Sequence, residues 1–105
     1  MLSEQEFRVR SDEALGHARQ ALLPLADEEG FEVELQNGVL DLVFEEPRQT
    51  KFVVSPNAPV RQIWVSAMSR SYKLAWDAEG GTFALNGEAL IALLGRLTRE
   101  FLDHK

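Results

Sequence analysis

Carboxylate side chains crowd one short segment of the chain. Asp27, Glu28 and Glu29 are consecutive, and Glu32 and Glu34 follow at a spacing of two residues. On a β-strand, residues two apart point to the same face, which makes the last two carboxylates neighbours. Crowded carboxylates repel each other, and a hard cation relieves the repulsion because it prefers oxygen ligands. These five residues, called the acidic segment below, indicate an open and weakly binding cation site.

The acidic segment also has a simpler interpretation. Charges on an edge strand discourage pairing with other chains, and solvated carboxylates need no ligand. On the residues alone this second interpretation is the stronger one. If a cation does bind, nothing in an all-carboxylate patch selects one hard cation sharply, so we expect ions such as iron, manganese and calcium to compete for it.

Glu13 and His17 form a second candidate metal site, because residues four apart are neighbours on a helix. A single pair of this kind is weak evidence, and an exposed pair without a ligand is the favoured interpretation. The chain contains no cysteine, which excludes disulfides and thiolate ligands. Any bound metal would therefore need oxygen or imidazole ligands.

A third candidate is a surface around Trp64. Gln62 and Trp64 share one face of a predicted strand, whereas Ile63 and Val65 share the other. If the aliphatic pair faces the core, Trp64 lies on the open face of the sheet, where a large aromatic is typical of a protein interface. The alternative is packing of Trp64 against its strand neighbours. Three further residues are expected to join this surface: Arg61, which precedes Gln62, and Ser55 and Asn57, which border the turn that leads into the strand.

Helical spacing predicts the element that precedes the acidic segment. Ser3 and Glu6 form a capping box, which predicts that a helix starts there. Apolar residues then recur at helical spacing from Phe7 to Leu25, so one stripe of this helix should be buried. Pro24 removes a backbone donor and should kink or end the helix near its last turn.

Alternating apolar residues predict six strands downstream. They cover residues 31–35, 40–44, 51–55, 61–66, 72–76 and 82–85. Asn37-Gly38 predicts a hairpin, since both residues tolerate positive φ. Neither Pro56 nor Pro59 should join a central ladder, and Asn86 should cap a second helix. The expected fold is α+β: two helices on one face of a mainly antiparallel sheet of about six strands, forming a single domain over residues 1–105.

The charge is distributed unevenly along the chain. The net charge is −6, but residues 1–46 carry twelve acids against three arginines, and residues 47–105 carry five acids against eight basic residues. An acidic half argues against nucleic acid as a partner and favours cations or a basic protein surface. No apolar run is long enough to span a membrane, and the first residues lack the features of a targeting signal, so we expect a cytoplasmic protein.

Motifs typical of enzymes are absent from the sequence. It contains no glycine-rich phosphate loop, no G-x-S-x-G and no H-E-x-x-H. The carboxylates are expected on a projecting edge, where burial cannot tune a pKa for acid–base catalysis. The sequence therefore predicts a binding and regulatory protein, not an enzyme.

Two stretches carry a resemblance to a known family. Residues 37–40 (NGVL) are followed some twenty residues later by residues 59–66 (PVRQIWVS), with an aromatic at Tyr72 and residues 86–88 (NGE) opening the last helix. This series resembles the frataxin family over about residues 12–101. The resemblance implies the same two-helix sandwich and a small protein of iron–sulfur cluster assembly that binds a cysteine desulfurase and its scaffold and changes the rate of sulfur transfer.

The resemblance also implies roles for particular residues. The family holds iron weakly on an acidic ridge of the first helix and first strand, and the acidic segment with Glu13 corresponds to that ridge. The strand of Gln62 and Trp64 supplies the surface that meets the partner. We expect a monomer in the absence of iron.

Some positions depart from the family pattern. Leu23-Pro24, Ala75 and Gly81 replace the acids and the aromatic that are common there, so the ridge is thin. This leaves an alternative: a metal-independent adaptor that binds through the Trp64 surface alone.

Overall fold

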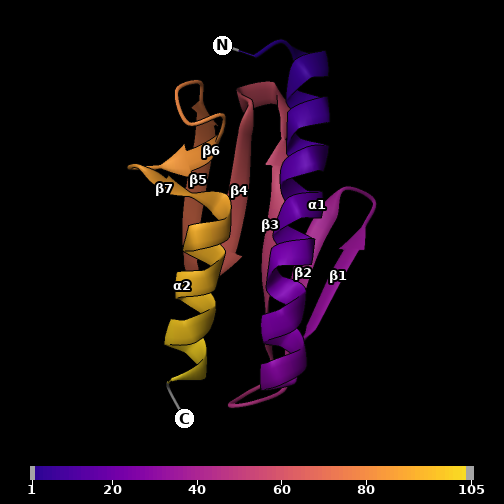
Figure 1. Ribbon diagram of the computed structural model, residues 1–105, viewed down its shortest axis with the longest axis vertical. Coiled ribbons are helices and arrows are strands. Elements are labelled where there is room, and N and C mark those ends of the chain that lie inside the picture. The colour runs from indigo at the N-terminus through magenta and orange to yellow at the C-terminus, as the bar shows by residue number, and fades with distance from the viewer. Residues whose placement is uncertain (1, 104–105) are drawn as a thin grey trace.

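The structure, a computed structural model, describes residues 2–103 and has two layers. Helices α1 (Glu4–Glu29) and α2 (Leu90–Leu102) lie side by side in front of a single sheet (Figure 1). The expected α+β fold is confirmed. The sheet has seven strands where the sequence predicted about six, because a strand of only two residues precedes α2.

The sheet is an antiparallel meander in which every strand pairs with its neighbours in sequence. Its strands are β1 (Glu32–Gln36), β2 (Val39–Phe44), β3 (Thr50–Asn57), β4 (Gln62–Ala67), β5 (Arg70–Asp77), β6 (Thr82–Leu85) and β7 (Glu88–Ala89), with a short 3₁₀ helix η1 (Ala58–Val60) between β3 and β4. This order leaves β1 and β7 at the two edges (Figure 1).

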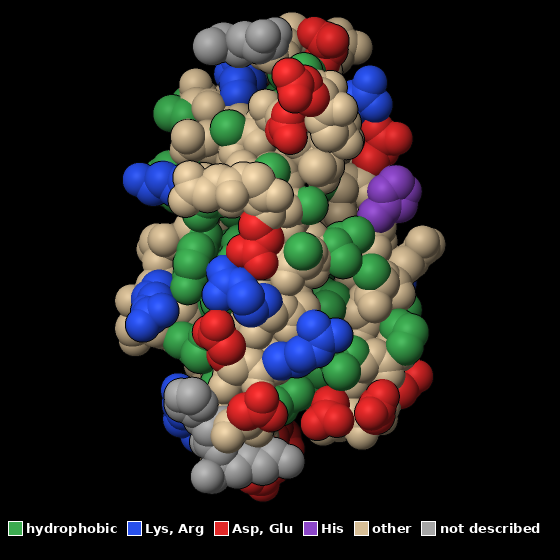
Figure 2. Space-filling model, turned by 60° about the vertical axis from the view of Figure 1, so that its left-hand side comes forward, with side chains coloured by type: hydrophobic (Ala, Val, Ile, Leu, Met, Phe, Trp, Pro, Cys, Tyr) green, Lys and Arg blue, Asp and Glu red, His purple; other side chains and the backbone are tan. Residues whose placement is uncertain are grey.

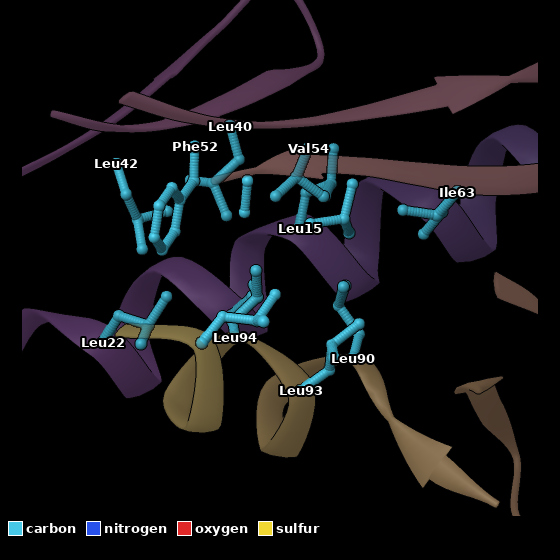
Figure 3. Close-up of a cluster of buried hydrophobic side chains, with 14 of the residues drawn as sticks. Leu15, Leu22, Leu40, Leu42, Phe52, Val54, Ile63, Leu90, Leu93 and Leu94 are labelled. Carbon is cyan, nitrogen blue, oxygen red and sulfur yellow. The ribbon is translucent and has the colours of Figure 1, made fainter. Parts of the chain in front are cut away.

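The core lies between the helices and one face of the sheet. Leucines of α1 and α2 meet aliphatic and aromatic side chains of β2, β3 and β4 (Figure 3). Phe44 is central, with its ring 4.7 Å from Phe31, 4.9 Å from Phe52 and 4.7 Å from Phe101 between centroids. Because only one sheet face is covered in this way, the other remains open to solvent or to a partner.

Helix α1 begins as the sequence predicts. The Ser3 hydroxyl accepts a hydrogen bond from the Glu6 amide at 3.1 Å, and the Glu6 carboxylate accepts one from the Ser3 amide at 3.1 Å. The bond from the Ser3 backbone is the main reason that the pKa of Glu6 lies below its usual value. The buried residues of α1 follow one stripe, and among residues 2–103 no helix combines the length and the hydrophobicity needed to cross a membrane.

The helix does not end near Pro24, which was one of the two predicted outcomes, because α1 continues to Glu29. Proline removes a bond to the carbonyl four residues earlier, here that of Gln20. Pro24 and Gln20 are both exposed, so water can hydrogen-bond to that carbonyl. Leu22 and Ala26, buried on either side, hold the last turns against the core.

The third strand runs past residue 55, where the sequence analysis ends it, because Pro56 lies in β3 opposite Ile63 of β4. The pairing between β2 and β3 stops at Val54. Pro56 therefore has a partner strand on one side only, and this is the edge-like position in which a strand tolerates proline.

Asn86 does not cap α2, whose N-cap is Ala89. Asn86 and Gly87 instead have φ of 50° and 83° and connect β6 to β7. Two residues with positive φ make a tight hairpin turn that matches the twist of the strands. The same dipeptide at Asn37-Gly38, with φ of 53° and 76°, joins β1 to β2 as predicted.

Two glycines, one inside α1 and one at its C-cap, provide a matched test of how the helix ends. Gly30, with φ of 81°, is its C-cap, whereas Gly16 lies inside the helix; an added Cβ meets no atom within 4 Å at either position. Gly30→Ala should lower the free energy of unfolding by about 1 kcal/mol, because L residues are strained in the left-handed region. Gly16→Ala should raise it by about 1 kcal/mol through helix propensity.

Urea unfolding followed by circular dichroism measures both changes. Equal effects of the two substitutions would show that the left-handed cap does not limit the stability of this helix end.

Candidate functional site

The acidic segment spans the end of α1 and two of the three outward-facing residues of β1. Gly30 ends the helix by donating its N–H to the Ala26 carbonyl at 2.8 Å, and Phe31 donates to the same oxygen at 3.1 Å. Phe31 is buried, which fixes the turn into β1 against the core. All five carboxylates of the segment belong to exposed residues. The structure thus brings the two halves of the acidic segment next to each other across one turn.

The last turn of α1 carries acids where a helix favours bases. It holds Asp27, Glu28 and Glu29 and no basic residue. The C-terminal end of a helix has a partial negative charge, so carboxylates are unfavourable there and cations are stabilising. This end of the helix therefore attracts positive charge, whether from a metal ion or from a basic protein surface.

Strand pairing adds a carboxylate that the sequence analysis did not select. Glu34 on β1 lies directly opposite Asp41 on β2, and like charges in this position repel. The Oδ1 atom of Asp41 is enclosed and has no hydrogen-bond partner within residues 2–103. This pairing could have been predicted from the sequence. A two-residue turn at Asn37-Gly38 sets the register of the hairpin, and in that register Glu34 lies opposite Asp41.

Glu13 lies apart from the acidic segment. It is about 22 Å from Glu28 along the helix axis, at 1.5 Å per residue. Its carboxylate is 3.5 Å from the Arg10 guanidinium. Glu13 and His17 line a hollow of about 220 Å³ together with Trp76, and the Arg10 guanidinium lies 5.4 Å from the centroid of that ring. The structure does not bring Glu13 to the same place as the other predicted metal ligands.

The carboxylates suit a weak, open site better than a closed one. Within residues 2–103, no three His, Asp or Glu side chains are grouped so that they could jointly hold a metal ion. Glu34 and Asp41 can offer oxygen ligands from two strands, and water would complete the coordination of a hard cation. Iron fits the chemistry of these oxygen donors, although the geometry does not select it over other hard cations.

Trp64 lies on the open face of the sheet, as predicted. Its neighbours Ile63 and Val65 are fully buried on the helix side, whereas Trp64 is half-buried on the other. The indole Nε1 donates a hydrogen bond to Gln62 Oε1 at 2.9 Å, and Lys73 Nζ lies 4.9 Å from the ring centroid. These contacts hold the indole in place and leave the Gln62 amide NH₂ able to donate to a partner.

The other predicted partner-binding residues differ in how available they are. Asn57 lies opposite Gln62 on the neighbouring strand, so it extends the same surface. Arg61 has φ of 53° and its guanidinium donates to the Ala58 carbonyl, which braces the turn of η1. Ser55 lies directly opposite Trp64 on β3. The sequence analysis missed that Lys73 lies opposite Trp64 on β5, although the antiparallel register could have shown it. Asn57, Gln62, Trp64, Ser55 and Lys73 are called the Trp64 face below.

Charge differs between the two candidate surfaces. Among the residues of the Trp64 face, Lys73 carries the one charge and none is acidic. Figure 2 turns forward the side of the molecule that carries α2, where Lys and Arg side chains lie among Asp and Glu side chains. The acidic segment lies on β1, at one edge of the sheet, and on the end of α1, whereas the Trp64 face lies on the central strands β3, β4 and β5. A partner that contacts both surfaces would need a basic region facing β1 and a polar or acidic one facing β4 and β5.

The architecture defines the class of protein. The frataxin of Psychromonas ingrahamii, a solved structure, superimposes on this chain with a TM-score of 0.70, and the match covers 94% of this chain and 90% of that one. The two sequences are 17% identical, so the likeness concerns the fold. The chain has a frataxin fold.

Sequence comparisons identify the family. The frataxin-like domain family matches residues 1–104. The chain is 33% identical over 97 residues to the iron-sulfur cluster assembly protein CyaY of Pseudomonas fluorescens, covering 89% of this chain and 86% of that protein. It is 33% identical over 103 residues to CyaY of Ectopseudomonas mendocina, covering 94% and 88%. The chain belongs to the frataxin family, which confirms the resemblance carried by residues 37–40 and 59–66.

The opposition of Glu34 and Asp41 leads to a stability prediction. Glu34→Gln should raise the free energy of unfolding by about 0.5 kcal/mol at low salt, because it removes one of two like charges directly opposite each other. The gain should shrink at high salt, which screens the repulsion. Urea unfolding at the two salt concentrations measures both effects.

Glu79→Gln is the control for this prediction, because it removes an exposed carboxylate from the turn between β5 and β6. An equal gain in both variants would mean that lower net charge, and not the Glu34–Asp41 pair, stabilises the protein.

Proposed function

We propose that this protein is a non-catalytic regulator of iron–sulfur cluster assembly that binds a cysteine desulfurase with its scaffold protein and changes the rate of sulfur transfer. The observation that carries the proposal is Trp64, held by Gln62 and Lys73 on an open sheet face that no helix covers. An oriented aromatic of this kind is typical of the centre of a protein interface. The proposal is also supported by relatives that are named iron-sulfur cluster assembly proteins.

The acidic segment would act by steering. Residues 1–46 have a net charge of −9, from twelve acids and three arginines. Such a field accelerates encounter with a basic patch on the desulfurase, and the acceleration falls as salt rises. The Trp64 face would then supply the desolvated contact that keeps the two proteins together.

Iron would bind weakly on the acidic segment and exchange readily. Glu34 of β1 and the added Asp41 of β2, which lie opposite each other, would offer two oxygen ligands, and water would supply the others. Glu32 would add charge beside them on β1, and Asp27, Glu28 and Glu29 would add charge at the negative end of α1. A bound cation neutralises the charge that steers the complex. The association rate with the desulfurase would thus depend on the iron concentration. Manganese or calcium could compete for the same carboxylates.

A second candidate function follows from the open geometry of the acids. Within residues 2–103 no set of three carboxylates converges on one point, and Glu13 is remote from the others. A metal-independent adaptor of the same fold would bind through the Trp64 face alone. The two functions differ in what added iron does to partner binding.

The steering role makes a prediction about rates. Glu32→Gln combined with Glu34→Gln should lower the association rate with a purified cysteine desulfurase by about tenfold at low salt and much less at high salt. Ferrous iron, added anaerobically, should reduce the rate for the wild type and have little effect on the variant. Biolayer interferometry measures these rates.

Asp12→Asn combined with Glu79→Gln is the control, since it removes two exposed carboxylates outside the acidic segment. If the Glu32/Glu34 variant associates at low salt as fast as the wild type, the steering role is refuted. Insensitivity of every variant to iron would favour the adaptor.

The Trp64 face makes a separate prediction. Trp64→Ala should weaken desulfurase–scaffold binding at least about tenfold, mainly through faster dissociation, because it removes the aromatic centre of the interface. Ile91→Ala is a suitable control, because Ile91 is an exposed hydrophobic residue of α2, outside the sheet. Thermal unfolding of both variants checks that they are folded. Undiminished binding by folded Trp64→Ala would remove this face from the proposal.

A further inference from the structure

One edge of the sheet is a strand long enough to pair with a strand of another chain. The edge strand β1 has five residues, whereas β7 at the opposite edge has two and runs directly into α2. Among residues 2–103, no strand pairs with the outer side of β1, and Figure 1 shows no helix or loop beyond it. An uncovered edge of this kind presents a row of unpaired backbone groups, to which an extended segment can add.

The register of the first hairpin shows which backbone groups face this edge. A two-residue turn places its flanking pair, here Gln36 and Val39, among the pairs that exchange hydrogen bonds, and such pairs alternate with non-bonded ones along the strands. Every second residue of β1, counted back from Gln36, therefore turns its backbone groups toward β2. Val33 and Leu35 lie between these residues, so their N–H and C=O groups face the free edge.

The outward backbone groups have no partner in the part of the chain that the structure describes. Within residues 2–103, no hydrogen bond of a turn, a cap or a side chain involves the backbone of Val33 or Leu35. Each of the two residues contributes one donor and one acceptor. They are two residues apart, about 7 Å at strand spacing, which is the spacing at which an antiparallel strand forms its paired bonds.

The helix-side face of β1 leaves apolar surface beside the free edge. Val33 and Leu35 point to this side and are half-buried, whereas Leu42 and Leu40, opposite them on β2, are fully buried. The cover of the core is thus incomplete at β1. Apolar side chains of an added strand would pack beside Val33 and Leu35 and extend the core.

The open face of β1 is acidic. Glu32 and Glu34 are exposed there, and neither takes part in an ion pair within residues 2–103. Like charges on neighbouring strands repel, and opposite charges attract. A second copy of β1 would bring its own glutamates to this face, so the edge disfavours pairing between copies. A strand with Lys or Arg at the matching positions would be attracted.

We infer that the free edge of β1 binds an extended basic segment of a partner protein, which adds to the seven-stranded sheet. In that segment, apolar residues opposite Val33 and Leu35 alternate with Lys or Arg opposite Glu32 and Glu34. Backbone hydrogen bonds supply affinity, and the alternating side chains supply specificity. The inference deepens the steering role proposed above and rests on it for the natural partner, because it describes the basic surface that reaches the acidic segment.

The test is a titration of the isotope-labelled full chain with a blocked peptide containing Thr-Val-Lys-Val-Lys. Paired antiparallel with β1, the peptide places its valines opposite Val33 and Leu35 and its lysines opposite the two glutamates. Amide signals and amide hydrogen exchange are followed by NMR. Without peptide, the amides of Val33 and Leu35 should exchange faster than that of Glu34. We expect saturable shifts at residues 32–36, dissociation in the millimolar range, and slower exchange at Val33 and Leu35 in the complex.

The matched control peptide carries an N-methyl group on each valine. It keeps the charges and side chains but lacks the two N–H groups that would donate to the edge, so it should bind at least about tenfold more weakly. Equal binding of the two peptides would show attraction between charges without strand pairing, and would overturn the inference.

A pair of double variants tests the contribution of the acidic face. Glu32→Gln combined with Glu34→Gln should weaken binding of the peptide about fivefold, because two cross-strand charge pairs are lost. Asp12→Asn combined with Glu79→Gln removes two exposed carboxylates elsewhere and should bind like the wild type. The dispersion of the amide spectrum shows that each variant is folded. Equal weakening in both double variants would overturn the inference.

The same spectra distinguish other modes of binding. Shifts at β7 or spread over the whole chain would overturn the inference. So would slower exchange at Val33 and Leu35 on raising the protein concentration without peptide, because the edge would then pair with a second copy. The titration needs neither iron nor a desulfurase, so its failure would leave the proposed function standing. Failure of desulfurase binding would likewise leave a positive peptide result intact.

Discussion

The burial of one sheet face against two helices is the constraint on which the other features depend. Alternation along each strand sends every second side chain into that interface, so the residues between them must point outward. In β4, full burial of Ile63 and Val65 forces Trp64 onto the open face. In β1, packing of Val33 and Leu35 against the core exposes the glutamates between and beside them. The core thus determines where both candidate surfaces lie, although none of its own side chains belongs to them.

The carboxylates of the acidic segment destabilise the fold locally. The end of α1 carries carboxylates where the helix dipole disfavours them, and Glu34 opposes Asp41 across two strands. Some acids elsewhere are compensated, as where Arg96 joins Glu88 and Glu100. A protein can carry such local repulsion when the rest of the fold is stable. The carboxylates that lack protein partners are the ones that a cation or a basic partner would stabilise.

Much of this could be predicted from the sequence, because the evidence for it is local. Alternation located six strands, and the Asn37-Gly38 turn fixed the register of the first hairpin. The errors arose where the outcome depended on the surroundings. Pro24 is tolerated inside a helix because it faces water, and Pro56 is tolerated in a strand because one neighbour ends early. The hydrogen bond from the Arg61 guanidinium to the Ala58 carbonyl also depends on the surroundings, because it forms in a turn that no periodicity reveals.

The meander topology affects the order in which the elements can assemble during folding. Each strand pairs with the strand made just before it, so the sheet can assemble by short-range steps that need little loop closure. The first helix is different. Phe7 packs edge-on against Phe83 at 5.6 Å between ring centroids, and α1 must wait for β6 and α2 before its stripe is covered. During synthesis, α1 is therefore made before the elements that shield its buried stripe from water.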